Sequence, residues 1–409
     1  MEGQHVLVIN PFSSPEYLAS ALRKLGMPCT ALYTAKALAC LDDLALSASP
    51  FDRTICVDSD EFEIVARHTI PEQYACILNG AEESTQLTDG LTERFFPHLS
   101  NGLETSSLRF DKYLMQEAVR QAGLPAILQT RISIPSDWNA VEQELQRVSF
   151  PVFCKPNVGY GSIGAFRADS MASLKEDFDA LSAGQQQEYL VQELVSADEY
   201  LIDTFSAAGS HHVCSVFKYR KQTINDTPLY RSAELVKDHA TWQRCCEYVA
   251  RLLPALGFRF GFAHIEIFIC ADGQIRLVEL NNRISGAHGT FNRMTEFNGL
   301  TSQVSALHQF LKGNRVRTPL PQSGQAESRS LFLFRFAAGR IMDPRRALDR
   351  FHSVRNVLML RPVGESVERP ARISLMDAVC IVELQAEHIS DIDRDAEAIH
   401  ALEARGELV

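Results

Sequence analysis

The stretch "VELNNRISG" (278–286) decides how this sequence is interpreted, because it brings an acid, two amides and an arginine into a run that otherwise predicts a buried strand. It follows "GFAHIEIFICADGQIRL" (261–277), where Asp272 and Gly273 separate two apolar runs. Asp-Gly in that setting is the strongest short signal for a β-hairpin. The sequence therefore predicts two antiparallel strands, the second of which ends in polar residues.

The predicted hairpin brings acidic side chains together. With a two-residue loop, Glu266 lies directly opposite Glu279, and His264 lies opposite Asn281. Facing like charges destabilise a sheet, and a cation between them removes that cost. Oxygen atoms from two carboxylates and an amide suit magnesium or manganese rather than zinc. Two alternatives stay open: a solvent-facing hairpin with two ordinary surface acids, or a three-residue loop that moves Glu266 away from Glu279.

A glycine-rich segment, "FPVFCKPNVGYGSIGAFRA" (150–168), supplies a second set of candidates. Gly159, Gly161 and Gly164 match G-x-G-x-x-G, but a dinucleotide site needs the third glycine to open a helix. Here "AFRA" predicts a strand, so the glycines form a loop between two strands that can fold over phosphates with its backbone N–H groups. Lys155 lies on the strand that enters the loop, where its ammonium can reach a phosphate.

Four more charged residues become candidates in combination. Lys112 lies at the start of a predicted helix, and Glu193 and Glu199 lie in "YLVQELVSADEYLID" (189–203). A carboxylate there can accept hydrogen bonds from ribose hydroxyls or from the adenine amino group. Arg283 follows the end of the second hairpin strand, and its spread charge suits a phosphoryl or acyl-phosphate group. Taken singly, each of the four has a simpler interpretation as an exposed surface charge.

The composition limits the class of protein. The 409 residues suggest two or three domains, and 45% hydrophobic with 22% charged residues is ordinary for a globular chain. The net charge of -11 disfavours nonspecific binding to nucleic acid. No basic segment followed by a long apolar run opens the sequence, and no stretch reaches transmembrane length, so we expect a cytoplasmic protein. Ten cysteines without a C-x-x-C pair indicate neither a zinc site nor a disulfide framework.

The first 108 residues alternate strand and helix signals. A helix predicted at 14–26 is amphipathic, with Ser14 as its N-cap and Gly26 as its stop. Strands are predicted at 5–10, 29–34, 53–58 and 74–80. This order predicts a small parallel α/β domain over residues 1–108.

The remaining chain predicts two α+β regions. Over residues 109–311, several strands follow one another without an intervening helix, which favours antiparallel sheet. These strands are 150–156 with 164–168, and 188–194 with 199–207 and 211–219. Beyond a segment rich in Pro, Gly and polar residues (312–330), further strands and a closing helix predict a small α+β domain that completes residues 312–409.

In this order, the motifs resemble the ATP-grasp superfamily over roughly residues 105–310. The matching segments are Lys112, "KPNVGYGSIG" (155–164), "VQELVSADEY" (191–200), "HIEIF" (264–268) and "VELNNRISG". The closest resemblance is to the carboxylate–amine ligases, which include the L-amino acid ligases that make dipeptides. It implies an ATP-grasp fold, in which the N-terminal region looks like the pre-ATP-grasp domain and the C-terminal region like the usual appended lobe.

The resemblance implies a role for each candidate. The implied ATP-binding residues are Lys112, Lys155, Gly161, Ser162, Glu193, Leu194, Val195 and Glu199, with a lid over about residues 130–195. The implied metal ligands are Glu266, Glu279 and Asn281, for magnesium or manganese, and the implied catalytic residues are Arg283 and Lys155. The substrate lies beyond these motifs. Substrate candidates are Gly286, Arg231 for an α-carboxylate and Glu234 for an α-amine, although a loop with the charges of Arg231 and Glu234 is more often simply solvated.

The implied reaction is the joining of a small carboxylate to an amine. ATP would phosphorylate the carboxylate, and the amine would attack the acyl phosphate to give an amide, ADP and phosphate. No Ser, Cys or His nucleophile is required, so His264 is expected to pack or to support the site. The alternatives are a biotin-carboxylase-like or purine-pathway ATP-grasp ligase, and a nucleotide-binding module without ligase activity. Neither nucleic acid nor a membrane is an expected partner, and a homodimer stays open.

Overall fold

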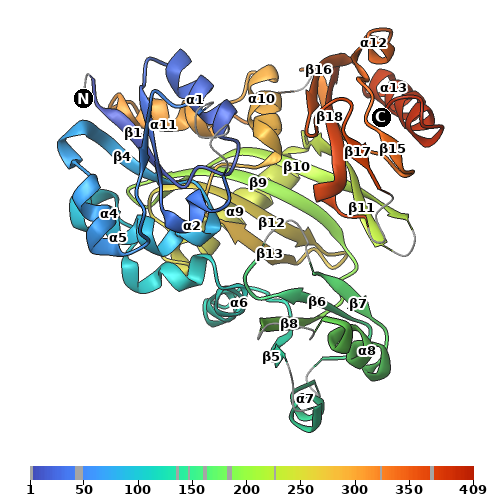
Figure 1. Cartoon of the computed structure of the whole chain (residues 1–409), viewed down its shortest axis with the longest axis horizontal. Coiled ribbons are helices and arrows are strands. Elements are labelled where there is room, and N and C mark those ends of the chain that lie inside the picture. Colours follow the sequence, from blue (N-terminus) through green and yellow to red (C-terminus); the bar gives the residue numbers. More distant parts are fainter. Residues whose placement is uncertain are drawn as a thin grey trace.

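The computed structural model of the chain describes residues 3–41, 49–134, 138–145, 148–159, 164–181, 187–224, 227–322, 325–368 and 373–409. Its strands form a parallel four-stranded sheet, an antiparallel four-stranded sheet, an eight-stranded sheet and a two-stranded ribbon. Figure 1 shows the N-terminal region and the small antiparallel sheet beside the large sheet, and the C-terminal region at one end of it. In the described part of the chain, no helix has both the length and the apolar character needed to cross a membrane.

The N-terminal sheet is parallel, as predicted, in the order β3-β2-β1-β4. Its strands are β1 (His5–Ile9), β2 (Cys29–Tyr33), β3 (Arg53–Cys56) and β4 (Tyr74–Asn79), and its helices are α1 (Pro15–Lys24), α2 (Ala35–Leu38), α4 (Phe62–His68) and α5 (Thr85–Phe95). Four consecutive apolar residues of β1 are buried, as expected for a parallel strand that is covered on both faces.

Ser14 occupies the N-cap position of α1, as predicted, but its side chain does not cap the helix. Its backbone is left-handed (φ 48) and its side chain makes no cap hydrogen bond. Instead, Ser14 Oγ donates to Ser285 O at 2.7 Å and accepts from Gly289 N at 2.8 Å, while Ser13 Oγ donates to Ile284 O at 2.9 Å. Tertiary partners have replaced the local cap, so the start of α1 holds the segment that follows the hairpin.

The small sheet is antiparallel, in the order β5-β8-β6-β7. Its elements are β5 (Gln129–Ile134), α7 (Trp138–Glu144), β6 (Val152–Pro156), β7 (Phe166–Ala168), α8 (Met171–Leu181) and β8 (Gln187–Glu193). Because β6 and β7 pair directly, the glycine-rich loop connects two strands, as predicted. The grouping of strand 188–194 with 199–207 is wrong, because β5 and β6 occupy both edges of β8.

The large sheet has the order β13-β12-β9-β10-β11-β14-β18-β16, and all its pairs are antiparallel. Residues 198–311 contribute β9 (Asp198–Ala207), β10 (Ser210–Ile224), β11 (Thr227–Leu235), α9 (His239–Ala255), β12 (Gly261–Ile269), β13 (Ile275–Asn281), α10 (Thr290–Phe297) and α11 (Gln303–Leu311). Helices α6 (Lys112–Gln121) and α9 share one apolar core with this sheet, in which Trp242 and Leu252 are fully buried.

The C-terminal region continues the large sheet, since β14 pairs with β11 through Ser232 and Leu331. Its elements are β14 (Glu327–Phe334), β15 (Gly339–Arg340), α12 (Arg345–Leu348), β16 (Val354–Met359), β17 (Ser366–Val367), β18 (Ala378–Ala386) and α13 (Ile389–Ala404). Helix α13 packs on β14 and β18 in a core of its own. The α+β composition is as predicted, but the strands are not a separate sheet.

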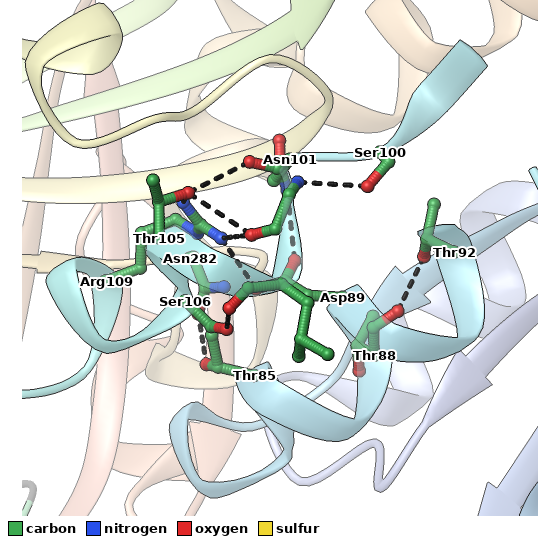
Figure 2. A network of polar contacts seen from close by, with 12 residues as sticks. Thr85, Thr88, Asp89, Thr92, Ser100, Asn101, Thr105, Ser106, Arg109 and Asn282 are labelled. Atoms are coloured by element: carbon green, nitrogen blue, oxygen red, sulfur yellow. Dashed lines mark hydrogen bonds and ion pairs between the residues drawn. The ribbon is translucent and has the colours of Figure 1, made fainter. Parts of the chain in front are cut away.

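A buried polar network joins the N-terminal region to the large sheet (Figure 2). Arg109, at the end of a 3-10 helix over residues 103–109, is fully buried, and its Nη2 lies 2.7 Å from Asp89 Oδ2 on α5. Arg109 Nη1 also donates to Leu256 O, beyond the end of α9, at 2.8 Å. Burial raises the pKa of Asp89, although Arg109 opposes that shift. The ion pair therefore fixes α5 to the frame that carries the hairpin.

Candidate active site

Strands β12 and β13 form the predicted hairpin at one edge of the large sheet. His264 pairs with Asn281, and Glu266 pairs with Glu279, so the predicted register is confirmed. Directly opposed residues of two strands share one face of the sheet. The two carboxylates therefore lie side by side, as the sequence indicated.

The predicted loop of this hairpin is wrong. Cys270 N donates to Gln274 O at 2.9 Å, so the loop has three residues, 271–273. A loop of this length shifts the pairing by one residue. A β-bulge at Val278, where the ladder skips one residue of β13, restores the pairing before the two acids. The three-residue loop and the bulge thus offset each other, and Glu266 faces Glu279 as in the simple hairpin.

The two facing carboxylates have different electrostatic surroundings. Burial, together with the charge of Glu279, raises the pKa of Glu266 well above its usual range. Burial also opposes the ionisation of Glu279, but Lys112 and Lys155 outweigh it and lower the pKa of Glu279 to about 2. The protein itself therefore balances the charge of Glu279 and leaves that of Glu266 without a sufficient partner.

The donor set fits a hard divalent cation. Glu266 and Glu279 offer carboxylate oxygens with 19% and 17% of each side chain exposed, and Asn281 lies beside them with its Nδ2 3.4 Å from Glu279 Oε1. Oxygen donors of this kind suit magnesium or manganese, which often use few protein carboxylates together with substrate phosphates. Within the described ranges, no cluster of three or more His, Cys, Asp or Glu side chains could hold a metal without such help.

Both predicted phosphate-binding lysines lie against the hairpin. Lys155, on β6, is 9% exposed, and its Nζ donates to Val278 O, the carbonyl of the bulge, at 3.3 Å. Burial lowers the pKa of Lys155, while the acids around it oppose the shift. Lys112, on α6, donates to Gly159 O at 2.6 Å and lies 3.5 Å from Glu279 Oε2. The two ammoniums therefore flank the acids from two different elements.

The predicted adenosine residues lie where the chain passes from the small sheet to the large one. Glu193, at the end of β8, accepts from Leu128 N and from Arg276 Nη1, each at 2.9 Å. Glu199, on β9, is buried and accepts from Tyr230 Oη at 2.8 Å. Between them, Leu194 is exposed and Val195 is half-buried. Gly161 and Ser162, predicted in the glycine loop, lie outside the described residues.

Arg283 lies two residues beyond β13 and is held by the N-terminal region. Its Nε donates to Glu82 Oε1 at 2.8 Å, and its Nη1 donates to Ile284 O at 3.0 Å. Burial opposes the charge of Arg283, but Glu82 outweighs it and raises the pKa of the guanidinium. Gly286 is close by, because a Cβ added there would lie 3.9 Å from Arg283 Nη1.

Arg231 and Glu234 are not in a loop, which corrects the prediction, but in β11. Arg231 Nη1 donates to Glu403 Oε1 on α13 at 3.1 Å, and the pair is buried. Glu234 is bonded by Arg220 Nη2 at 3.0 Å and by Arg329 Nη2 at 2.5 Å. The charges of both predicted substrate residues are thus already paired within the sheet and with the C-terminal helix.

His264 is a packed residue, as expected. Its Nδ1 lies 2.7 Å from Asp203 Oδ1, and its ring stacks on that of Phe291 with 5.9 Å between centroids. Its Nε2 is 3.9 Å from Glu266 Oε1, which is too far for a hydrogen bond. The ring therefore supports the floor of the site behind Glu266.

Three residues at the site were missed. Glu82, which accepts a hydrogen bond from Arg283, lies in the N-terminal region, and no motif in the sequence indicated it. Lys221 pairs with the buried Glu199. It lies in the charged run "KYRKQ" (218–222), which suggests a solvated strand. Lys221 could have been found only by assigning alternate residues of this strand to the face that carries Glu199. Asn157, two residues after Lys155, is buried between β6 and α6.

Comparisons with known proteins agree with this geometry. A model of the ATP-grasp domain matches residues 148–291. Dapdiamide A synthase from Enterobacter agglomerans is 25% identical over 292 residues, which cover 69% of this chain and 67% of that protein. D-alanine–D-alanine ligase from Streptococcus agalactiae is 26% identical over 199 residues, 45% of this chain. The match spans only 55% of that ligase.

Solved structures share the whole architecture. L-amino acid ligase from Bacillus licheniformis has a TM-score of 0.77 at 16% identity, over 98% of both chains. Carboxyaminoimidazole ribonucleotide synthase from Aspergillus clavatus, complexed with ATP, has a TM-score of 0.74 at 13% identity, over 99% of this chain and 100% of that one. At such identities the likeness shows the fold. Residues 148–291 therefore match the ATP-grasp domain, and over nearly its whole length the chain shares the fold of the L-amino acid ligase from Bacillus licheniformis.

Proposed function

We propose that this chain is an ATP-dependent carboxylate–amine ligase, which forms an amide or peptide bond through an acyl phosphate and releases ADP and phosphate. One observation carries the proposal: Glu266 and Glu279 face each other between Lys112 and Lys155. Two acids and two ammoniums at one sheet edge are the charges that a metal-bound triphosphate requires. The names of the two relatives, a synthase and a ligase, agree with this reaction class.

In the proposed site, the two lysines bind the ATP phosphates and the two outer acids hold the nucleoside. Lys112 and Lys155 offset phosphate charge. Glu193 and Glu199 accept from the adenine amino group or the ribose hydroxyls. Magnesium or manganese, bound by Glu266, Glu279 and Asn281, supplies Lewis-acid charge neutralisation. Gly161, Ser162, Leu194 and Val195 stay proposed nucleotide contacts.

Arg283 is the proposed catalytic group at the acyl phosphate. Its guanidinium can stabilise negative charge on the transferred phosphoryl group and on the oxygen of the attacked carbonyl. The hydrogen bond to Glu82 restricts the movement of the Arg283 guanidinium. In the proposed reaction, catalysis comes from positioning and charge neutralisation, and no nucleophilic side chain is needed. Gly286 stays a proposed substrate contact. We do not extend the proposal to Arg231 and Glu234, whose charges are paired elsewhere.

The proposed substrates are small carboxylates and amines, at least one of them an amino acid, in the cytoplasm. The proposed functional units are residues 1–108, residues 109–311 with a lid over about 130–195, and residues 312–409. These limits follow the sequence pattern rather than the sheets, since β14 continues the large sheet.

The test is a screen of amino acids and small acids in pairs, with phosphate release and product mass as readouts. We expect ADP, phosphate and an amide whose mass is the sum of the two substrates less water. Stoichiometric AMP and pyrophosphate would contradict the acyl-phosphate route. Carboxylation of a substrate that depends on bicarbonate would favour the biotin-carboxylase-like or purine-pathway alternative. Nucleotide binding without turnover of any pair would favour a binding module.

A further inference from the structure

Asn157 lies between the two lysines that are proposed to bind phosphate. Only 2% of its surface is exposed. It follows Lys155 by two positions, just after β6, and on its other side it contacts the first turn of α6, which carries Lys112. None of the metal, nucleotide or catalytic roles above involves this residue.

Both polar atoms of the Asn157 side chain have partners within the protein, at the start of α6 and on β8. Nδ2 donates to Asp111 Oδ2 at 3.0 Å and to Glu188 Oε2 at 3.3 Å, and Oδ1 accepts from Tyr113 N at 3.0 Å. Its backbone oxygen accepts from Lys112 N at 3.4 Å. A side chain with all its hydrogen bonds made inside the protein has one favoured orientation.

These bonds complete the N-terminus of α6. The first N–H groups of a helix have no partner within the helix. Lys112 N and Tyr113 N are bonded to Asn157, and Leu114 N is bonded to Asp111 Oδ1 at 2.9 Å. Part of the cap of α6 thus comes from Asn157, which follows a strand of the small sheet. The position of Lys112 depends on this cap.

Helix α6 itself is fixed to the strand of the proposed metal ligands. Gln116 Nε2 donates to Leu277 O at 2.6 Å, and Leu280 N donates to Met115 Sδ at 3.2 Å. Strand β6, by contrast, belongs to the small sheet. Asn157 therefore links the small sheet, through α6, to the strand that carries the proposed metal ligands.

We propose that Asn157 is a positioning residue for the ATP phosphates, which holds Lys112 and Lys155 at a fixed spacing and docks the small sheet on α6. This inference rests on the proposed nucleotide site. Each ammonium is already turned inward, onto Gly159 O at 2.6 Å and Val278 O at 3.3 Å respectively. Restraint of this kind lowers the ordering cost when a phosphate binds to two flexible lysines.

The experiment measures ADP and adenosine binding to the full chain by calorimetry with magnesium present. In Asn157→Ala, we expect the dissociation constant of ADP to rise about tenfold, the effect of about one weakened charge-assisted contact. Adenosine affinity should stay unchanged, because adenosine does not reach the lysines. A residue that merely held the fold together would not separate the two ligands.

A charge exchange gives a second variant that does not depend on Asn157→Ala folding well. Asn157→Asp places a carboxylate beside Asp111 and Glu188, so ADP should bind more weakly still. Adding Asp111→Asn restores a donor and an acceptor between the two positions, and part of the ADP affinity should return. The matched control is Asn298→Ala, another buried asparagine, bonded to Met294 O at 2.7 Å and away from the site, which should lower stability and leave ADP binding unchanged.

The outcomes separate this inference from the proposed function. Unchanged ADP affinity in Asn157→Ala, equal weakening of ADP and adenosine, or no recovery in the exchanged pair would overturn the role of Asn157 and leave the ligase proposal standing. If the unmodified chain bound neither ADP nor ATP, the proposed function would fail, and the inference with it.

Discussion

At the residue level, Glu279 is the acid on which the charge balance of the site depends. Glu279→Gln keeps the side-chain volume but removes the charge that Lys112 and Lys155 stabilise. We expect a folded variant with a lower melting temperature, because Lys112 and Lys155 lose a counter-charge, and a loss of magnesium-dependent turnover of at least about a hundredfold. Phosphate release with a productive substrate pair measures it. Glu327→Gln, on β14 and paired with Lys237 at 3.3 Å, is the matched control and should turn over normally.

Single residues of the site were predictable where their chemistry is local in sequence. Glu266 and Glu279 share one hairpin, so their spacing indicated that they face each other, although this pairing depends on the bulge that offsets the three-residue loop. The partner of Arg283 was beyond reach, because Glu82 lies 201 positions away and only the packing of two domains joins them. Arg231 was misplaced for the same reason, since its partner Glu403 lies on the last helix.

Among the elements, α5 and the 3-10 helix over residues 103–109 are joined by the most deeply buried ion pair. Asp89→Asn leaves Arg109 buried without a counter-charge, and we expect a loss of about 3–5 kcal/mol in the free energy of unfolding. Urea denaturation measures it. The exposed pair of Arg94 and Glu63 offers the comparison, and Glu63→Gln should cost less than about 1 kcal/mol. Equal losses in the two variants would contradict the structural role of the buried pair.

Elements were predicted better than their ends and junctions. Apolar periodicity identified the strands, and Asp-Gly identified the hairpin, because both are short-range signals. The three-residue loop and the bulge at Val278 were missed, since neither changes the apolar pattern by itself. Ser14 failed as a cap because Ser285 and Gly289, far along the chain, compete for its hydroxyl.

For the whole molecule, the continuous large sheet decides what can be removed. A chain that ends at residue 311 loses β14, β18 and β16, and β11, which still pairs with β10, becomes an edge strand whose outer backbone groups at residues 232–234 lose their partners. Unpaired edges of this kind promote association between chains. We expect this truncated chain to aggregate, as measured by size-exclusion chromatography, while the full chain stays in solution. A monomeric truncated chain that binds ATP would show that residues 312–409 are an independent lobe.

The same sheet bears on how the protein is made. During synthesis, β11 emerges with residues 227–235, whereas its partner β14 follows only with residues 327–334. For the time that about a hundred residues take to leave the ribosome, roughly 5–20 s, the nascent chain carries an open strand edge next to an apolar core. In the folded protein, β14 pairs with residues 232–234 of this edge, whereas the nascent chain has no such partner. Slowed elongation between these two strands should therefore lower the yield of native protein.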